Sequence, residues 1–295
     1  MAVLLASYNG ADWIGEQIQS ILRSEGVDCH IFLSDDGSGD DTVNVARCEG
    51  GERLTLLPIA PRRSAAQNFI RLVQEAEWDG YDYVSLADQD DRWFPDKLAK
   101  AVRAIETHDL AGYSSDVQAF WPDGRRRYIR KSQPLRRFDY LLESAGPGST
   151  FVFPAKAANF LRMQLNKADT ETLGGIERHD WLFYAYFREA SMPWLIDATA
   201  GLDYRQHESN VVGAAAGLRA RLARLDLVSN GWYRSQILAV GKLTGASNAL
   251  LEYLRKPEVK SWGKLLAHSR EYRRRLSEAC AITLLLMAMA IGKKR

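Results

Sequence analysis

The sequence predicts an α/β fold with an open, mostly parallel sheet flanked by helices. Short apolar runs of strand length alternate with amphipathic segments of helical spacing through the first half of the chain. Polar turns rich in Asn, Asp and Gly follow several of the apolar runs. This alternation places consecutive strands side by side and parallel, with the connecting helices on both faces of the sheet.

Four apolar runs are expected to form the first strands, at residues 2–7, 30–34, 54–58 and 83–86. Segments 13–24, 40–48, 65–76 and 95–106 are expected to be the intervening helices. In the first helix, apolar residues recur at the spacing of one helix face, at Ile14, Ile18, Ile21 and Leu22. Pro95 suits the last helix because proline is favoured in a first helical turn.

The second half of the chain is less regular. Residues 113–120 and 151–154 are expected to be strands, and 180–189 a helix. The basic run GRRRYIRK, residues 124–131, is expected to be mobile. After residue 213 the pattern becomes helical, with segments at 218–228, 233–243 and 246–254, so that a helical extension follows the sheet.

Composition and charge indicate a soluble globular protein of two unlike parts. The chain has 295 residues, of which 46% are hydrophobic and 26% charged. Three cysteines far apart in the sequence argue against a disulfide framework and favour a reducing compartment. Residues 214–295 carry 16 Lys and Arg against 5 Asp and Glu, whereas residues 1–213 are acidic, with 23 against 32. Such a split fits a catalytic body with a tail that meets an anionic surface, or simply a solvated basic helical face.

The last apolar segment, ACAITLLLMAMAIG at 279–292, is too short to span a bilayer. A helix of that length reaches about 21 Å, against a hydrocarbon core of roughly 30 Å. Basic residues flank it at 273–275 and 293–295, which favours shallow insertion at an anionic membrane face. A helix buried in the core or in a homodimer is the alternative. The first residues, with no basic leader, are expected to be a strand and not a signal peptide.

Three polar motifs directly follow predicted strands: Ser7-Tyr-Asn9, Asp35-Asp-Gly-Ser38 and Asp88-Gln-Asp-Asp91. In open parallel sheets, ligands bind beyond the carboxyl ends of the strands. The three motifs should therefore converge on one rim of the sheet and form a site.

The stretch LADQDDRW, residues 86–93, places three carboxylates within four residues. Unpaired, these charges repel each other and are costly to bury. Either the cluster lies in a solvated turn or a cation sits among the carboxylates. Asp88 and Asp90, at alternate positions, can supply the oxygen ligands that a hard divalent cation prefers.

Five motifs in order resemble the family 2 glycosyltransferases of GT-A fold. They are VLLASYNG at 3–10, SDDGS at 34–38, ADQDD at 87–91, RHDW at 178–181 and YRQHESNVVG at 204–213. The last two resemble the rhamnosyltransferase branch of that family. Each motif is weak alone, but five in order are specific, and together they cover about the first 213 residues.

The resemblance implies a nucleotide-sugar donor and a divalent cation, Mg²⁺ or Mn²⁺. It assigns the donor to a set of strand-end residues, namely Ser7, Tyr8, Asn9, Asp35, Asp36, Arg63, Asn68, Asp88 and Gln89. The cation maps onto Asp88 and Asp90, with Asp91 as a further ligand or an orienting group. His207 is either a ligand of the metal or diphosphate, or a packed residue. Arg205 and Gln206 are expected to contact phosphate or acceptor.

The resemblance also implies a catalytic base near the start of a helix, and Asp180 in RHDW matches it. Its alternative is a helix N-cap, and Glu177 is the second candidate for the base. In this branch His179 stands where many relatives have Glu. The turn Gly146-Pro-Gly-Ser-Thr150 resembles the acceptor-side turn of the family.

The expected function is therefore an inverting, metal-dependent transfer of a sugar. The favoured donor is dTDP-β-L-rhamnose and the acceptor a bacterial surface glycan, such as lipopolysaccharide or O-antigen, on a lipid carrier. Residues 1–110 would bind the donor, 111–213 the acceptor, and the basic extension 214–295 would hold the enzyme at the cytoplasmic membrane face. Another nucleotide-hexose donor, or a nucleotidyltransferase, is the alternative. The acidic body and the absence of a recognised nucleic-acid motif argue against nucleic-acid binding.

Overall fold

The computed structural model describes residues 1–207, 231–258, 261–275 and 279. Its centre is a seven-stranded sheet with strand order β10-β6-β9-β4-β1-β2-β3. The strands are β1 (Ala2–Ser7), β2 (His30–Asp35), β3 (Leu54–Leu56), β4 (Tyr83–Ala87), β6 (Gly112–Ser115), β9 (Val152–Pro154) and β10 (Trp194–Asp197). All adjacent pairs are parallel except those of β9, which runs antiparallel to β4 and β6. The predicted α/β class is confirmed.

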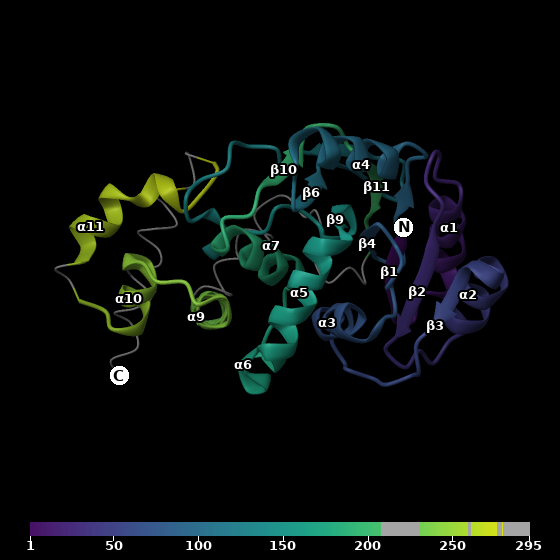
Figure 1. Cartoon of the computed structure of the whole chain (residues 1–295), viewed down its shortest axis with the longest axis horizontal. Helices are drawn as coiled ribbons and strands as arrows, with labels where there is room; N and C mark the ends of the chain where they lie inside the picture. Colours follow the sequence, from purple (N-terminus) through teal and green to yellow (C-terminus); the bar gives the residue numbers. More distant parts are fainter. Residues whose placement is uncertain (208–230, 259–260, 276–278, 280–295) are drawn as a thin grey trace.

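Helices cover both faces of this sheet (Figure 1). The helices are α1 (Ala11–Leu22), α2 (Thr42–Gly50), α3 (Ala65–Glu75), α4 (Lys97–His108), α5 (Ala155–Lys167), α6 (Thr170–Gly174) and α7 (His179–Glu189). Side chains of β1 alternate between two hydrophobic clusters: Val3 and Leu5 pack with α1, α2 and α4, whereas Ala2 and Leu4 pack with α3, α5 and α7. A strand buried on both faces reads as a continuous apolar run, which is why β1 was easy to predict.

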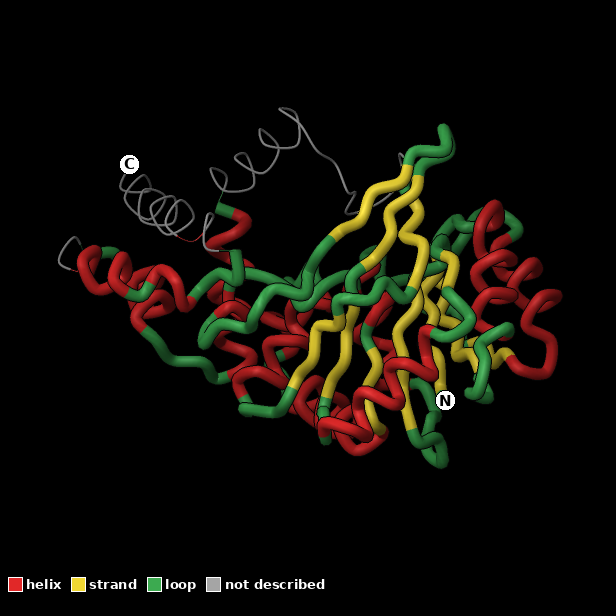
Figure 2. Tube along the Cα trace, turned by 90° about the horizontal axis from the view of Figure 1, so that it is seen from above, coloured by secondary structure: helices red, strands yellow, loops and turns green. Residues whose placement is uncertain are grey.

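A second, four-stranded sheet has the order β5-β11-β7-β8. Its strands are β5 (Arg92–Trp93), β11 (Leu202–Arg205), β7 (Val117–Phe120) and β8 (Arg126–Ile129). Figure 2 shows strands seen from above with the helices beside them. The prediction of one strand over 113–120 was wrong, because the chain passes from the first sheet to the second at Asp116. The buried carboxylate of Asp116 accepts hydrogen bonds from the N–H groups of Lys131 and Ser132. These contacts hold the chain just after β8, and the basic run itself pairs with β7 as an antiparallel edge strand. Its expected mobility stays a prediction.

The C-terminal elements within the described ranges are helical: α9 (Trp232–Thr244), α10 (Ala249–Arg255) and α11 (Trp262–Ala267). Short 3-10 turns complete the chain at Gly51–Arg53, Asp139–Leu141, Gly148–Thr150 and Ser269–Glu271. Apolar side chains of α9 and α10, such as Ile237 and Leu251, belong to the same core cluster as α7. The predicted helix 218–228 and the apolar segment 280–292 lie outside the described residues. No helix in the described ranges is long and apolar enough to cross a bilayer.

Candidate active site

The three polar motifs lie at the same edge of the large sheet. Ser7, the last residue of β1, is paired with Asp35, the last residue of β2. On the other side of β1, Leu5 is paired with Ala87, and the acidic turn begins at the next residue. Because all three strands are parallel, their carboxyl ends meet here, as the sequence predicts.

Asp35 is buried and fully engaged by the protein. One carboxylate oxygen accepts from the hydroxyls of Ser7, at 2.7 Å, and Ser38, at 2.6 Å. The other accepts from the N–H groups of Gly37, at 3.0 Å, and Ser38, at 2.7 Å. Asp35 therefore shapes the turn after β2, with its oxygens directed at the chain itself.

Asp36 and Asn68 hold the neighbouring loop in place. The carboxylate of Asp36 accepts hydrogen bonds from the N–H groups of Arg62, Arg63 and Ser64, just before α3 begins. Asn68 is buried and donates from its side chain to the carbonyl of Ser34 at 2.8 Å. The side chain of Arg63 is exposed at this edge, so a ligand can reach this cation.

The loop after β1 presents an exposed aromatic ring. Tyr8 is 55% exposed, although its backbone is tied down. Its N–H donates to Oε1 of Gln89 at 2.8 Å, and Nε2 of Gln89 donates back to its carbonyl at 3.0 Å. Asn9 bridges to the turn after β2, since its Oδ1 accepts from the N–H of Gly39 at 2.8 Å. Gly10 permits this packing, because a Cβ there would lie 2.2 Å from Oε1 of Gln89.

The acidic turn holds carboxylates in a largely buried setting, and no cation of the described structure neutralises all of them. Burial, followed by the charges of Asp90 and Asp180, raises the pKa of Asp88 to about 7. Burial, followed by the charges of Asp90 and Asp88, raises the pKa of Asp91 well above its usual range. Asp91 is wholly buried, and its Oδ2 has no hydrogen-bond partner in the described structure. The turn is thus electrostatically unfavourable as it stands and would be stabilised by a cation.

Asp180 joins this cluster from α7. It lies in the first turn of the helix, where Arg178 occupies the N-cap position, so a role for Asp180 as the cap is not what the helix shows. Burial raises the pKa of Tyr204 well above its usual range, and Asp88, Asp91, Asp90 and Asp180 all add to that rise. Carboxylates from two distant parts of the chain therefore act electrostatically on the same side chain. Glu177, the second candidate for the base, is exposed.

His179 has a packing role beside Asp180. Its ring stacks on Phe69, with centroids 3.9 Å apart and planes 21° apart. Burial lowers the pKa of His179 to about 4, so the ring is neutral at physiological pH. A Cβ at Gly148 would lie 2.4 Å from its Nε2, so the small-residue turn rests directly on this ring.

His207 and Arg205 hold the acidic turn from the second sheet. Nε2 of His207 lies 2.7 Å from Oδ2 of Asp90, and the ring stacks on Trp13 at 4.1 Å. Arg205 donates from Nε to the carbonyl of Asp90 at 2.7 Å and forms an ion pair with Glu16. Gln206 is buried. The sequence suggested phosphate or acceptor contacts for Arg205 and Gln206, whereas here Arg205 supports the acidic turn.

The donor set fits a hard divalent cation, although the site is not a closed cage. No group of three or more His, Cys, Asp or Glu side chains is arranged to hold a metal within the described ranges. Mg²⁺ is commonly bound by one or two carboxylates together with substrate phosphates, so a closed protein cage is not required. The unpartnered, buried Oδ2 of Asp91 and the crowded carboxylates around it are what such a cation would satisfy.

Lys97 is a buried cation that the sequence did not reveal. It is 2% exposed, and its Nζ lies 3.5 Å from the ring centroid of Trp93 and 3.5 Å from Oγ of Ser85. Burial lowers its pKa to about 7, while the charge of Asp91 opposes that change. No carboxylate of the described residues forms an ion pair with it. The sequence does not reveal that Lys97 is buried near Asp91, because this depends on the tertiary structure.

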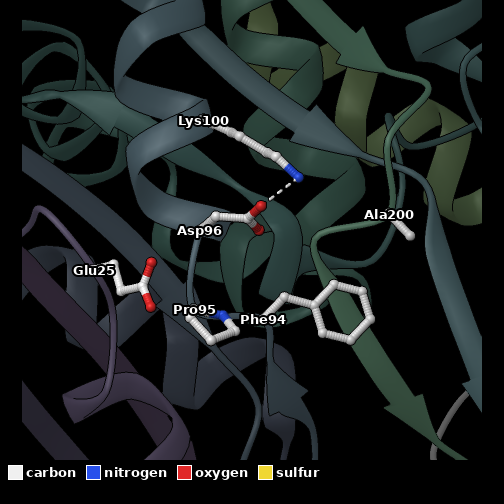
Figure 3. A pocket seen from close by; sticks show the side chains of 6 residues that line it. All are labelled: Glu25, Phe94, Pro95, Asp96, Lys100 and Ala200. Atoms are coloured by element: carbon white, nitrogen blue, oxygen red, sulfur yellow. Dashed lines mark ion pairs between the residues drawn. The ribbon is translucent and has the colours of Figure 1, made fainter.

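A separate hollow lies beside the start of α4 (Figure 3). It encloses about 490 Å³ and is lined by Glu25, Phe94, Pro95, Asp96, Lys100 and Ala200. Its charged pair, Lys100 and Asp96, is joined at 2.7 Å within one turn of helix. None of the predicted site residues lines this hollow, so it does not contribute to the site at the sheet edge.

A parallel sheet whose carboxyl edge carries an exposed aromatic loop, an acidic turn and a carboxylate on a facing helix is the arrangement of enzymes acting on nucleotide-linked substrates. The chain belongs to glycosyl transferase family 2, because the model of that family matches residues 2–167. It is a glycosyltransferase and resembles the rhamnosyltransferases in particular. The dTDP-rhamnosyl transferase RfbG of Shigella flexneri is 34% identical over 290 residues, which cover 96% of this chain and 98% of that protein.

Solved structures confirm the fold at low sequence identity. The complex of S. aureus TarS 1-349 with UDP-GlcNAc is 12% identical, with a TM-score of 0.56, covering 99% of this chain and 88% of that one. The mannosyltransferase PcManGT from Pyrobaculum calidifontis, solved with GDP-Man and Mn²⁺, is 16% identical, with a TM-score of 0.51, covering 99% and 86%. These likenesses support the GT-A architecture and say nothing of this chain's own donor.

Proposed function

We propose that this glycosyltransferase moves L-rhamnose from dTDP-β-L-rhamnose onto a bacterial cell-surface glycan, with inversion at the anomeric carbon. The observation that carries the proposal is the convergence of the acidic turn and Asp180 in a chain that matches RfbG over nearly its whole length. The proposed acceptor is a lipid-linked precursor of lipopolysaccharide, O-antigen or a related polysaccharide, at the cytoplasmic face of the membrane.

The donor nucleotide is proposed to lie on the loop after β1. The exposed ring of Tyr8 offers a flat apolar face to the base, and Asn9 and Arg63 are polar groups at the same rim. Ser7, Asp35, Asp36 and Asn68 act by fixing these loops. The side chains of Ser7, Asp35 and Asp36 bond to the backbone or to each other, and Asn68 donates to the carbonyl of Ser34. Gln89 couples this nucleotide side to the acidic turn.

The donor diphosphate is proposed to sit against the acidic turn. Asp88 and Asp90 would hold Mg²⁺ or Mn²⁺ there, and Asp91 would add negative charge beside the cation. His207 would position Asp90 through its contact at 2.7 Å. The bound cation would offset negative charge on the departing diphosphate. Without a counter-charge, the same carboxylates would repel the donor.

Asp180 is proposed to be the general base. Its carboxylate accepts the proton of the acceptor hydroxyl while that oxygen forms a bond to the anomeric carbon. The bond from that carbon to the diphosphate oxygen breaks on the opposite face, and dTDP leaves with the electron pair. The β-linked donor would thus give an α-linked product. The charge of Asp180 acts on Asp88 and Tyr204, which supports a role for Asp180 beside the acidic turn.

A panel of nucleotide sugars tests this proposal. Release of the nucleoside diphosphate would be measured with dTDP-L-rhamnose, UDP-glucose, UDP-GlcNAc and GDP-mannose, each with Mg²⁺, with Mn²⁺ and with EDTA. We expect turnover of dTDP-L-rhamnose and of none of the other three nucleotide sugars. We also expect EDTA to abolish this turnover. If another nucleotide sugar is turned over preferentially, the chain is still a glycosyltransferase, but the proposed donor is wrong. Turnover that is equally fast with EDTA would show that the reaction does not need a divalent cation.

A further inference from the structure

The exposed edge of the second sheet is unusually basic. Strand β8 and the turn before it, residues 121–131, contain Arg125, Arg126, Arg127, Arg130 and Lys131 against the single acid Asp123. We call this segment the basic edge. β8 is the outermost strand of its sheet, and the four arginine residues are exposed. The site at the other end of this sheet uses none of these residues.

Two arginine residues of the basic edge form ion pairs with described residues. Arg125 pairs with Asp123 at 2.6 Å, and Arg126 pairs with Asp203. Even so, the side chains of Arg125 and Arg126 keep 70% and 51% of their exposure. The arginine side chains of the basic edge are therefore accessible to an external anion, whereas Lys131 is partly buried.

The fold adds a further cation from the far end of the chain. Nη2 of Arg275 lies 3.5 Å from the carbonyl oxygen of Arg130, although the two residues are 145 positions apart in sequence. The guanidinium group of Arg275 thus donates to the backbone beside the basic edge. The fold therefore adds one more cation to this surface.

Aromatic groups at the tip indicate which kind of anionic partner fits. Trp121 is partly exposed at the turn, and the guanidinium groups of Arg125 and Arg127 lie 5.2 and 5.7 Å from its ring centroid. Tyr128, in the strand itself, is 48% exposed. Tryptophan and tyrosine beside arginine are typical of the headgroup region of a membrane, where rings meet acyl chains and guanidinium groups meet phosphate.

We infer that the basic edge docks on the headgroups of an anionic phospholipid bilayer. An extended nucleic acid fits less well, because residues 1–213 as a whole carry 23 basic against 32 acidic side chains and would repel a polyanion running across them. A flat lipid surface, in contrast, would contact only the basic edge and not the acidic remainder of residues 1–213. Apart from Arg275, the cations of this contact lie in the second sheet and not in the basic tail, and the contact does not depend on which sugar is transferred.

The position of the edge suits a lipid-linked acceptor, a point that rests on the proposed function. The strand order β5-β11-β7-β8 puts β8 three strand spacings from β5, the strand that directly follows the acidic turn. Three spacings amount to about 14 Å. With the edge on the headgroups, the site would lie close to the membrane plane, where the first sugars of such an acceptor project.

The test is co-sedimentation of the full chain with vesicles of phosphatidylcholine alone or with about one third phosphatidylglycerol. The triple variant Arg125→Gln, Arg127→Gln, Arg130→Gln is compared with the matched variant Arg47→Gln, Arg53→Gln, Arg103→Gln, which removes three exposed arginine charges elsewhere. Each cation near an anionic membrane strengthens partitioning roughly fivefold. We expect the edge variant to bind the anionic vesicles at least about tenfold more weakly, and the matched variant to bind like the wild type.

Equal binding by wild type and edge variant would overturn the inference and leave the C-terminal tail as the membrane contact. Equal weakening of both variants would also overturn it, since net charge alone would then explain binding. Tight binding of DNA that competes with the vesicles would assign the edge to nucleic acid. Unchanged thermal unfolding and donor turnover without vesicles would show that the edge variant is folded. If it is not, the same comparison is made with Arg127→Gln and Arg130→Gln singly.

Discussion

The side-chain amide of Gln89 pairs with the peptide groups of Tyr8 through two hydrogen bonds, at 2.8 and 3.0 Å. One side chain thereby joins the loop that presents the exposed ring to the turn that carries the carboxylates. In the proposed function, the two halves of the donor, nucleoside and diphosphate, lie on the two sides of this link. Their relative position would then depend on Gln89.

Replacing Gln89 with alanine removes both hydrogen bonds and leaves the peptide groups of Tyr8 without those partners. We expect a loss of about 1–3 kcal/mol in the free energy of unfolding and a weaker affinity for the donor nucleotide. Gly10→Ala should reproduce the effect, because its Cβ would displace the Gln89 amide. Urea unfolding and calorimetric titration with dTDP measure the two quantities. Gln74→Ala, on α3 with a single 3.4 Å contact to Leu165, is the control and should bind dTDP normally.

Asp180→Asn keeps the size of the side chain and removes its basicity. We expect kcat to fall by about 10²–10⁴-fold, while the dissociation constant of the donor stays near the wild-type value. Glu177→Gln is the matched control, since Glu177 lies three residues away and is exposed. Initial rates at saturating donor decide the matter. If Glu177→Gln is the inactive variant instead, the base has been misassigned.

Lys97 should make stability depend on pH above neutrality. Its pKa is about 7 in the folded chain, against 10.5 for an ordinary lysine, so between these values the unfolded chain binds more protons. Stability of the wild type should therefore rise with pH in this window, by up to about 1.4 kcal/mol per pH unit. Lys97→Met should flatten the profile, measured by urea unfolding at pH 7 to 9.5. Lys100→Met, in the same helix and paired with Asp96, should not. An unchanged slope in Lys97→Met would mean that this amine is solvated.

The ionised carboxylate of Asp88 should lower the free energy of unfolding of the chain, although the proposed function requires this carboxylate. Its pKa is raised to about 7, so the folded chain holds a proton more firmly than the unfolded chain between about pH 4 and 7. This contribution to stability is lost as pH rises through that window. Asp88→Asn should therefore unfold at a higher temperature than the wild type at pH 8, yet turn over no donor. A variant that is both less stable at pH 8 and fully active would refute the electrostatic account of the turn.

Much of the large sheet can be predicted from sequence because its strands are continuous apolar runs. The segments predicted at 2–7, 30–34 and 83–86 correspond to β1, β2 and β4 within one residue. Their polar ends had to meet at one edge, since parallel strands end on the same side. The convergence of the motifs followed from topology alone.

The second sheet could not be predicted from the sequence. Its strands have only two to four residues, which is too short for a regular alternation of apolar and polar residues to be recognised. The break at Asp116 depends on hydrogen bonds to Lys131 and Ser132, which no local pattern reveals. The same holds for the support of the acidic turn by Arg205 and for the buried amine of Lys97. These contacts join residues that are distant in sequence.

The most direct test of the central claim is the rate of dTDP release from dTDP-β-L-rhamnose in the presence of Mn²⁺, compared between wild type and Asp90→Asn. We expect metal-dependent release by the wild type and a loss of at least about 100-fold in the variant. Release at the wild-type rate by Asp90→Asn, with the same response to EDTA, would contradict it.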